Sequence, residues 1–250
     1  MKLEILFKNN SFKEQLSNIT IPDNVSKRVY CYAGLHSVTY EINDKSLISA
    51  KTLSDIRKSF VDNKIDCYIS IDEAIEFFNV SLYPKFNMFE RNLRRLIYII
   101  AIKSGDREML EYANIITIHR SFGKLMEKLF KNEEKLKPIK KRSYNSEFMK
   151  QMTERQIDGL SKKTLWSYFV AQNSFTAAHS KELGDCRNDV MHSNEMSFET
   201  FVHMDHVIEE SNREVELLIA QYLNRTYIST PAQEALKKIA KNFINLAESD

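Results

Sequence analysis

The sequence predicts a mainly helical protein that begins with a small mixed α/β region. The chain of 250 residues has only 5 Gly and 4 Pro, a composition typical of helix-rich domains. Hydrophobic residues make up 43% of it, which is enough to form a buried core. Strand-like patterns are confined to residues 1–80, whereas residues 84–250 show the three-and-four spacing of helices.

Residues 1–80 are expected to contain strands and a short helix. β-Branched and aromatic residues indicate strands over Leu3–Phe7, Ser37–Ile42 and Ile65–Ile69. Ser70 is the expected N-cap of a helix from Ile71 to Asn79. We find no phosphate-binding loop or other site motif in this region, so its role stays open.

The helical region is expected to begin at Pro84, and its first helix to end at Gly105. A second helix is expected from Arg107 to about Lys131. The apolar residues of the first helix fall on one face, namely Phe86, Phe89, Leu93, Leu96 and Ile100.

The rest of the chain is expected to alternate between loops and helices. Lys137–Arg142 should be an exposed basic loop, and Thr153–Gln156 has the form of a capping box. Gly184-Asp185 is expected to interrupt the helical pattern, and Ser197 to cap a helix that reaches about Asn224. Thr230–Gln233 is a second capping box. The expected buried residues here are Leu160, Leu165, Trp166, Phe169, Leu236, Ile239, Phe243 and Leu246.

Composition restricts the possible function classes. A net charge of +2 excludes a strongly basic nucleic-acid-binding protein, although a local basic groove remains compatible with RNA. Three widely spaced cysteines and the lack of a signal-peptide pattern predict a reducing, cytoplasmic location. The longest apolar run, Leu96–Ile102, is too short to cross a bilayer, so no membrane partner is expected. No cofactor is expected either.

The segment Arg187–His192, which reads R-N-x-x-x-H, is the main candidate for a site. An imidazole such as that of His192 transfers protons near neutral pH. A guanidinium such as that of Arg187 stabilises the charge that develops on phosphate oxygens. These two groups suit metal-free cleavage of RNA, in which the 2′-hydroxyl attacks the adjacent phosphorus. Asn188 could position a phosphate oxygen or orient the imidazole.

The spacing limits how this pair acts. Five residues of helix place Arg187 and His192 about 140° apart, whereas Asn188 and His192 share a face. One chain therefore needs Arg187 at the start of a helix, where its long side chain could reach round. Two chains related by a two-fold axis would supply a denser site.

This motif resembles that of the HEPN superfamily (higher eukaryotes and prokaryotes nucleotide-binding), and Phe89–Ile97 resembles the first core helix of many bacterial members. The resemblance covers about residues 84–250. It implies a HEPN-like helical bundle and a homodimer formed through the motif-bearing helices. It also implies metal-independent endoribonuclease activity that leaves 2′,3′-cyclic phosphate or 3′-phosphate ends.

By this resemblance Arg187 and His192 are the catalytic pair and Asn188 is the polar residue that follows the arginine. Glu90 is a supporting polar residue, and we also regard Asp189, inside the motif, as supporting. Many prokaryotic members are toxins or abortive-infection effectors. An anti-phage role is therefore implied, and a toxic nuclease needs an antitoxin or other regulatory partner.

Several of these residues also have structural interpretations. Glu90 and Arg94 have the spacing of a helical ion pair. Arg91 either contacts RNA phosphate or is a solvated charge, and the same two options hold for Lys140, Lys141 and Arg142. His179 is either part of the pocket or a surface residue, and Cys186 is expected to be a small buried residue.

Two other functions remain open. The chain could be a non-catalytic helical module that binds RNA, a nucleotide or a partner protein. His203, Asp205 and His206 could instead serve a metal-dependent hydrolase, although no further ligand is spaced with them.

Overall fold

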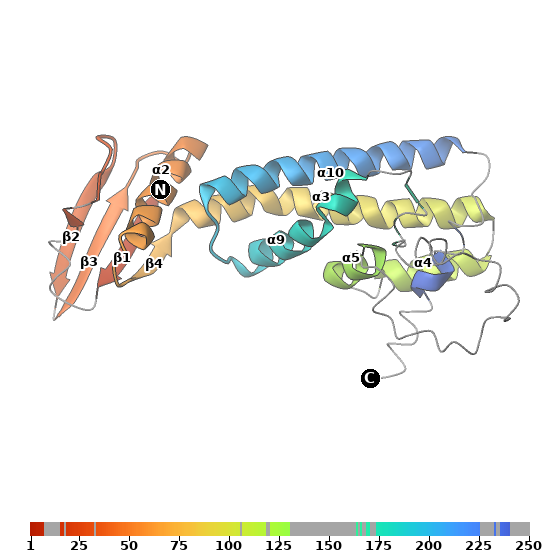
Figure 1. Ribbon diagram of the computed structural model, residues 1–250, viewed down its shortest axis with the longest axis horizontal. Coiled ribbons are helices and arrows are strands. Elements are labelled where there is room, and N and C mark those ends of the chain that lie inside the picture. Colours follow the sequence, from red (N-terminus) through yellow and green to blue (C-terminus); the bar gives the residue numbers. More distant parts are fainter. Residues whose placement is uncertain are drawn as a thin grey trace, which may run out of the picture. The chain divides into compact units, whose positions relative to one another are not determined.

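The computed structural model is mostly helical, with a small antiparallel sheet near the N-terminus (Figure 1). It describes residues 1–7, 16–17, 19–32, 34–105, 107–118, 121–130, 164, 166, 169–170, 174–225, 233 and 236–240. The chain forms two compact units. The first combines Met1–Phe86 with Asp185–Val207, and the second combines Asn87–Gly184 with Ile208–Asp250. The Arg187–His192 segment thus belongs to the same unit as the N-terminal sheet.

The sheet of the first unit has the order β2-β3-β1-β4, and each neighbouring pair is antiparallel. Its strands are β1 (Lys2–Phe7), β2 (Ser26–Tyr32), β3 (Leu35–Glu41) and β4 (Cys67–Asp72). Burial alternates along β1, because every second side chain points into the core. The strands expected over Leu3–Phe7 and Ser37–Ile42 are confirmed, the one expected over Ile65–Ile69 lies at Cys67–Asp72, and β2 was not predicted.

Helix α2 (Leu47–Asp62) covers the buried face of this sheet. The ring of its Phe60 lies 6.1 Å from the ring of Phe7 on β1 and 6.1 Å from that of Tyr40 on β3. Ser46 caps the helix, since its side chain accepts a hydrogen bond from the Ser49 amide. The sequence analysis did not identify α2, although serine, the residue at position 46, is a preferred N-cap residue and so indicates a helix start.

Helix α3 runs without a break from Glu73 to Ser104. The expected cap at Ser70 is wrong, because β4 continues to Asp72. The Asp72 carboxylate accepts hydrogen bonds from the Ala74 and Ile75 amides instead. The expected start at Pro84 is also wrong. Pro84 lies inside α3 on its exposed side, where water can bond the carbonyl that the missing N–H leaves unpaired.

Helices α3 and α10 (Phe198–Asn224) run parallel within each unit. In the first unit the rings of Phe78 and Phe201 stack 4.7 Å apart. In the second unit the Asn92 amide donates to Glu216, and Lys103 donates to the carbonyl of Leu223. The expected end of α3 at Gly105 and the expected cap of α10 are confirmed. Ser197 Oγ accepts the Thr200 amide at 3.1 Å.

The second unit adds α4 (Arg107–Ile118) and α5 (Phe122–Phe130). The single helix expected over 107–131 is therefore wrong. Ser121 marks the start of α5, since its side chain accepts the Lys124 amide and its carbonyl accepts the Leu125 amide. All five apolar residues expected on the face of α3 are buried, and so are Trp166, Phe169, Leu236 and Ile239.

Helix α9 (Ser180–His192) follows the four-residue α8 (Phe175–Ala178) and contains Gly184-Asp185 in its interior. The expected break there is wrong. A helical glycine costs about 1 kcal/mol relative to alanine. Burial of Leu183, Cys186 and Val190 on one face compensates for that cost. The basic loop, both predicted capping boxes, Leu160, Leu165, Phe243 and Leu246 lie wholly or partly outside the described residues.

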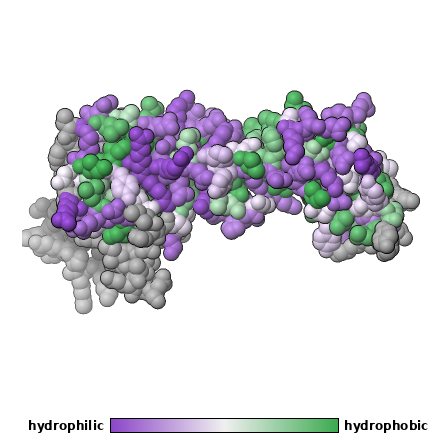
Figure 2. Space-filling view, turned by 180° about the vertical axis from the view of Figure 1, so that it is seen from behind, coloured by the Kyte–Doolittle hydropathy of each residue, from purple (hydrophilic) through white to green (hydrophobic). Residues whose placement is uncertain are grey.

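Among the described helices, none combines the length and the apolar character needed to cross a membrane. On the face drawn in Figure 2, hydrophobic and hydrophilic residues are intermixed along the described chain.

Candidate functional site

The Arg187–His192 segment forms the C-terminal half of α9. Asn188 and His192 are exposed, and Arg187 is half-buried. Met191, beside His192, is 43% exposed, one of several apolar side chains that reach the surface of the described chain. The exposed side of this helix therefore carries Asn188, Met191 and His192 together, and the half-buried Arg187 borders the buried face formed by Leu183, Cys186 and Val190.

Arg187 is not at a helix start. The sequence analysis expected it there, because only at a helix start could Arg187 reach the same site as His192 of its own chain. It lies seven residues after Ser180, and His192 is the last residue of the helix. Because both residues are helical, their Cα–Cβ bonds point about 140° apart and their positions differ by about 7.5 Å along the axis. The two side chains therefore point to different sides of α9.

The helix ends immediately after His192 in a Schellman turn. Ser193 has the left-handed backbone that this turn requires, with φ of 52°. The Asn194 amide donates to the Asp189 carbonyl at 2.9 Å, and the Ser193 amide donates to the Val190 carbonyl at 3.5 Å. The Asn194 side chain also donates to the Asp189 carboxylate at 2.9 Å. The backbone at His192 is thus fixed by bonds on both sides of it.

These contacts give Asp189 a structural role, because its carboxylate closes the turn. Cys186 is buried, as expected. Burial, with a smaller contribution from the charge of Asp189, raises the pKa of the Cys186 thiol to about 12. A thiol with so high a pKa is protonated at neutral pH, which leaves it no part in nucleophilic chemistry.

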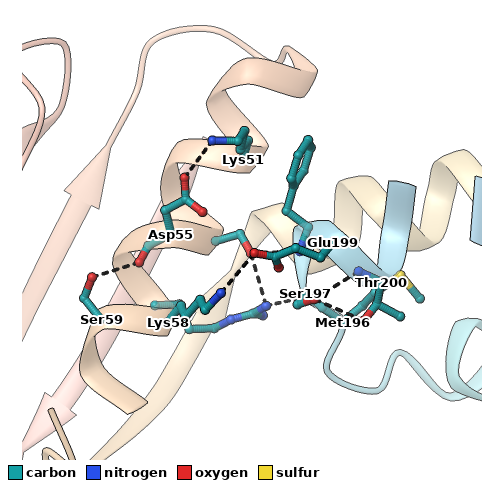
Figure 3. Close-up of polar contacts among 11 residues, drawn as sticks. Lys51, Asp55, Lys58, Ser59, Met196, Ser197, Glu199 and Thr200 are labelled. Carbon is teal, nitrogen blue, oxygen red and sulfur yellow. Dashed lines mark hydrogen bonds and ion pairs between the residues drawn. The ribbon is translucent and has the colours of Figure 1, made fainter. Parts of the chain in front are cut away.

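Helix α2 holds the segment that joins His192 to α10 (Figure 3). Arg57 donates to the Met196 carbonyl, and the Phe198 amide donates to Ser54 Oγ at 3.2 Å. On the exposed side of the same contact, Lys58 pairs with Glu199 at 3.0 Å. Sequence analysis did not find these α2 residues, since they precede the motif by more than 100 positions.

Glu90 belongs to the second unit and has a local partner. Its carboxylate accepts from Arg94 Nη2 at 2.6 Å, and Arg94 also donates to the Thr117 carbonyl. This confirms the predicted helical ion pair and shows that it joins α3 to α4. Arg91 is exposed on α3. Lys140, Lys141 and Arg142 lie outside the described residues.

The other three histidines considered as site residues have different surroundings. The ring of His179 stacks on Phe175 at 4.2 Å, and its Nδ1 lies 3.0 Å from the Phe175 carbonyl oxygen. His203 and His206 are exposed, while Asp205, between them, pairs with Lys85 at 2.5 Å. Within the described part of the chain, no three His, Cys, Asp or Glu side chains are grouped to hold a metal ion.

Comparisons of this chain with protein-family models, with curated proteins and with solved structures gave no match.

Proposed function

We propose that this protein is a metal-independent endoribonuclease that acts as a homodimer of HEPN type. The observation that carries the proposal is the arrangement of α9. A solvent-exposed imidazole is held at the fixed end of a helix, with a polar amide on the same face and a half-buried guanidinium beside that face. A proton-transfer group and a phosphate-binding group are what RNA cleavage by 2′-hydroxyl attack requires.

The angle between the two side chains favours a site shared by two copies. One α9 presents Arg187 and His192 about 140° apart, so a single phosphate does not readily meet both from one chain. In a two-fold dimer, His192 of one copy and Arg187 of the other can face the same phosphate. The exposed side chain of Met191 supplies apolar surface that such a partner would cover.

In this mechanism His192 takes the 2′-hydroxyl proton or donates one to the departing 5′-oxygen, a step worth about 10²–10⁴-fold in rate. Arg187 binds the non-bridging oxygens as negative charge builds on phosphorus. Asn188 orients the imidazole or a phosphate oxygen. The P–O2′ bond forms as the P–O5′ bond breaks, which leaves a 2′,3′-cyclic phosphate and a 5′-hydroxyl; hydrolysis of the cyclic ester by water then gives a 3′-phosphate.

Incubation of the purified protein with total RNA in EDTA tests the proposal. We expect cleavage in chelator, with Arg187→Ala and His192→Ala each lowering the rate by about 10²-fold or more. Both variants should keep the circular dichroism spectrum and the dimer mass of the wild type. Cleavage by His192→Ala at the wild-type rate would refute the assignment.

The role in the cell that the resemblance implies, a toxin or anti-phage effector with a neutralising partner, forms part of this proposal. Expression of the wild type should then arrest growth, and expression of either variant should not.

The same 140° angle favours a second function if the protein is a monomer. A single chain could bind RNA, a nucleotide or a partner without cleaving anything. RNA binding by a monomer, with intact RNA ends and no effect of either substitution on those ends, would favour this alternative.

A further inference from the structure

The segment that follows the turn after His192 is held by a buried arginine from the N-terminal region. Arg57 lies on α2, and its side chain is 8% exposed. One nitrogen, Nη1, pairs with the Asp72 carboxylate at 2.8 Å, and the other, Nη2, donates to the Met196 carbonyl. A guanidinium can bond the Asp72 carboxylate and the Met196 carbonyl at once because its donors form a planar fork. The single ammonium of lysine does not provide this geometry.

The partners of Arg57 are themselves fixed. Asp72 caps α3 through its Oδ1 atom and pairs with Arg57 through Oδ2, so its position is set by the start of that helix. Ser54, one turn before Arg57, accepts the first amide of α10 from Phe198. Helix α2 thus bonds the chain at two points, Met196 just before α10 and Phe198 at its first residue.

Only three residues separate His192 from Met196, and the first two of them are locked by the Schellman turn. Met196 is 3% exposed, so its carbonyl has little access to water as a substitute for Arg57. A shift of Met196 is therefore transmitted to the end of α9. Displacements of about 1 Å at a catalytic group cost as much as 10²-fold in rate.

We propose that Arg57 is a positioning residue for His192, so that the N-terminal α/β region forms part of the catalytic unit. This inference rests on the proposed ribonuclease function. Arg57 acts without touching RNA: it holds the Met196 carbonyl, and the turn between Met196 and α9 sets the orientation of the His192 ring. Substrate binding should then survive changes at Arg57, while proton transfer should not.

The test is RNA cleavage by the Arg57→Lys variant. Lysine keeps the positive charge beside Asp72 and loses the planar pair of donors that also reaches the Met196 carbonyl. We expect kcat to fall by about tenfold or more while KM for a short RNA stays within about threefold. The pH profile of kcat should also change, because the imidazole loses its aligned geometry. The matched control is Asp55→Asn, on the exposed face of α2, whose partner there is Lys51. It should cleave at the wild-type rate.

Ser54→Ala keeps the test decisive if Arg57→Lys does not fold. It removes the acceptor of the Phe198 amide and of a 3.5 Å bond from Arg57 Nη2, while the bonds of Arg57 to Asp72 and Met196 remain. We expect an intermediate fall in kcat with a folded spectrum. Wild-type kcat and pH profile in the folded Arg57→Lys variant, or in Ser54→Ala if the former is unfolded, would overturn the inference. Loss of the requirement for Arg187 and His192 would instead overturn the proposed function, so the two failures are distinguishable.

Discussion

Replacement of Arg57 by methionine should destabilise the first unit strongly. Methionine keeps much of the volume of the side chain and removes its charge and donors. Asp72, 8% exposed, then remains as a buried carboxylate without its cation, a change that typically costs about 3–5 kcal/mol. Two backbone amides still bond Asp72, which favours the lower end of that range. The Met196 carbonyl also loses a donor, at a cost of about 1 kcal/mol.

The two contributions give about 4 kcal/mol, which corresponds to a fall in Tm of about 8–16 °C for a chain of this size. Thermal unfolding followed by circular dichroism measures it. The matched control is Lys58→Met, one residue further along α2, where both members of the ion pair are more than half exposed. Its Tm should stay within about 2 °C of the wild type. Equal Tm values for the two variants would refute the reasoning, because they would mean that the Arg57 contacts contribute no more than a surface pair.

Three further predictions concern helix ends and a helix interior. Pro84→Ala should raise stability by about 1–3 kcal/mol, since it restores a hydrogen bond inside α3; a lower Tm would contradict this. Ser193→Gly should raise stability by about 1 kcal/mol, because glycine adopts the left-handed backbone without strain; an unchanged or lower Tm would count against the Schellman turn. The backbone amide of Glu199, together with Lys58 and Ser197, lowers the pKa of the Glu199 carboxyl from 4.5 to about 2. Its charge therefore stabilises the fold above pH 4.5, and this contribution is lost as the pH falls toward 2. Glu199→Gln should accordingly lower Tm at pH 7 and match the wild type near pH 2, and a Tm difference independent of pH would rule this out.

Local patterns predicted the parts of the fold that depend on neighbouring residues. The alternation in β1, the cap at Ser197 and the stop at Gly105 all follow from side chains close in sequence. Where the structure differs from the expected helix boundaries, burial, solvent exposure or a nearby cap outweighed the local signal that the sequence analysis used. Burial on both sides of Gly184 keeps α9 helical, and α3 continues through Pro84 because that residue faces solvent.

The sequence predicted which residues form the candidate site, but it did not predict how these residues are arranged in space. Arg187, Asn188 and His192 can be read directly from the sequence, but the break expected before them gave a wrong helix start. The bond from Arg57 to Met196 joins residues 139 positions apart, so no local spacing reveals it. The sequence did not predict the turn at Ser193 either. A left-handed residue after a helix is usually glycine, and this position is occupied by serine.

A mixing experiment tests the shared site most directly. Arg187→Ala and His192→Ala are each inactive in the proposed account, and the two variants are mixed in equal amounts under conditions that let subunits exchange. If Arg187 and His192 act from different subunits, half of the dimers are mixed and each has one intact site, so about a quarter of the wild-type cleavage should return. No return of cleavage, despite mixed dimers detected by mass, would contradict a site built across the two-fold axis.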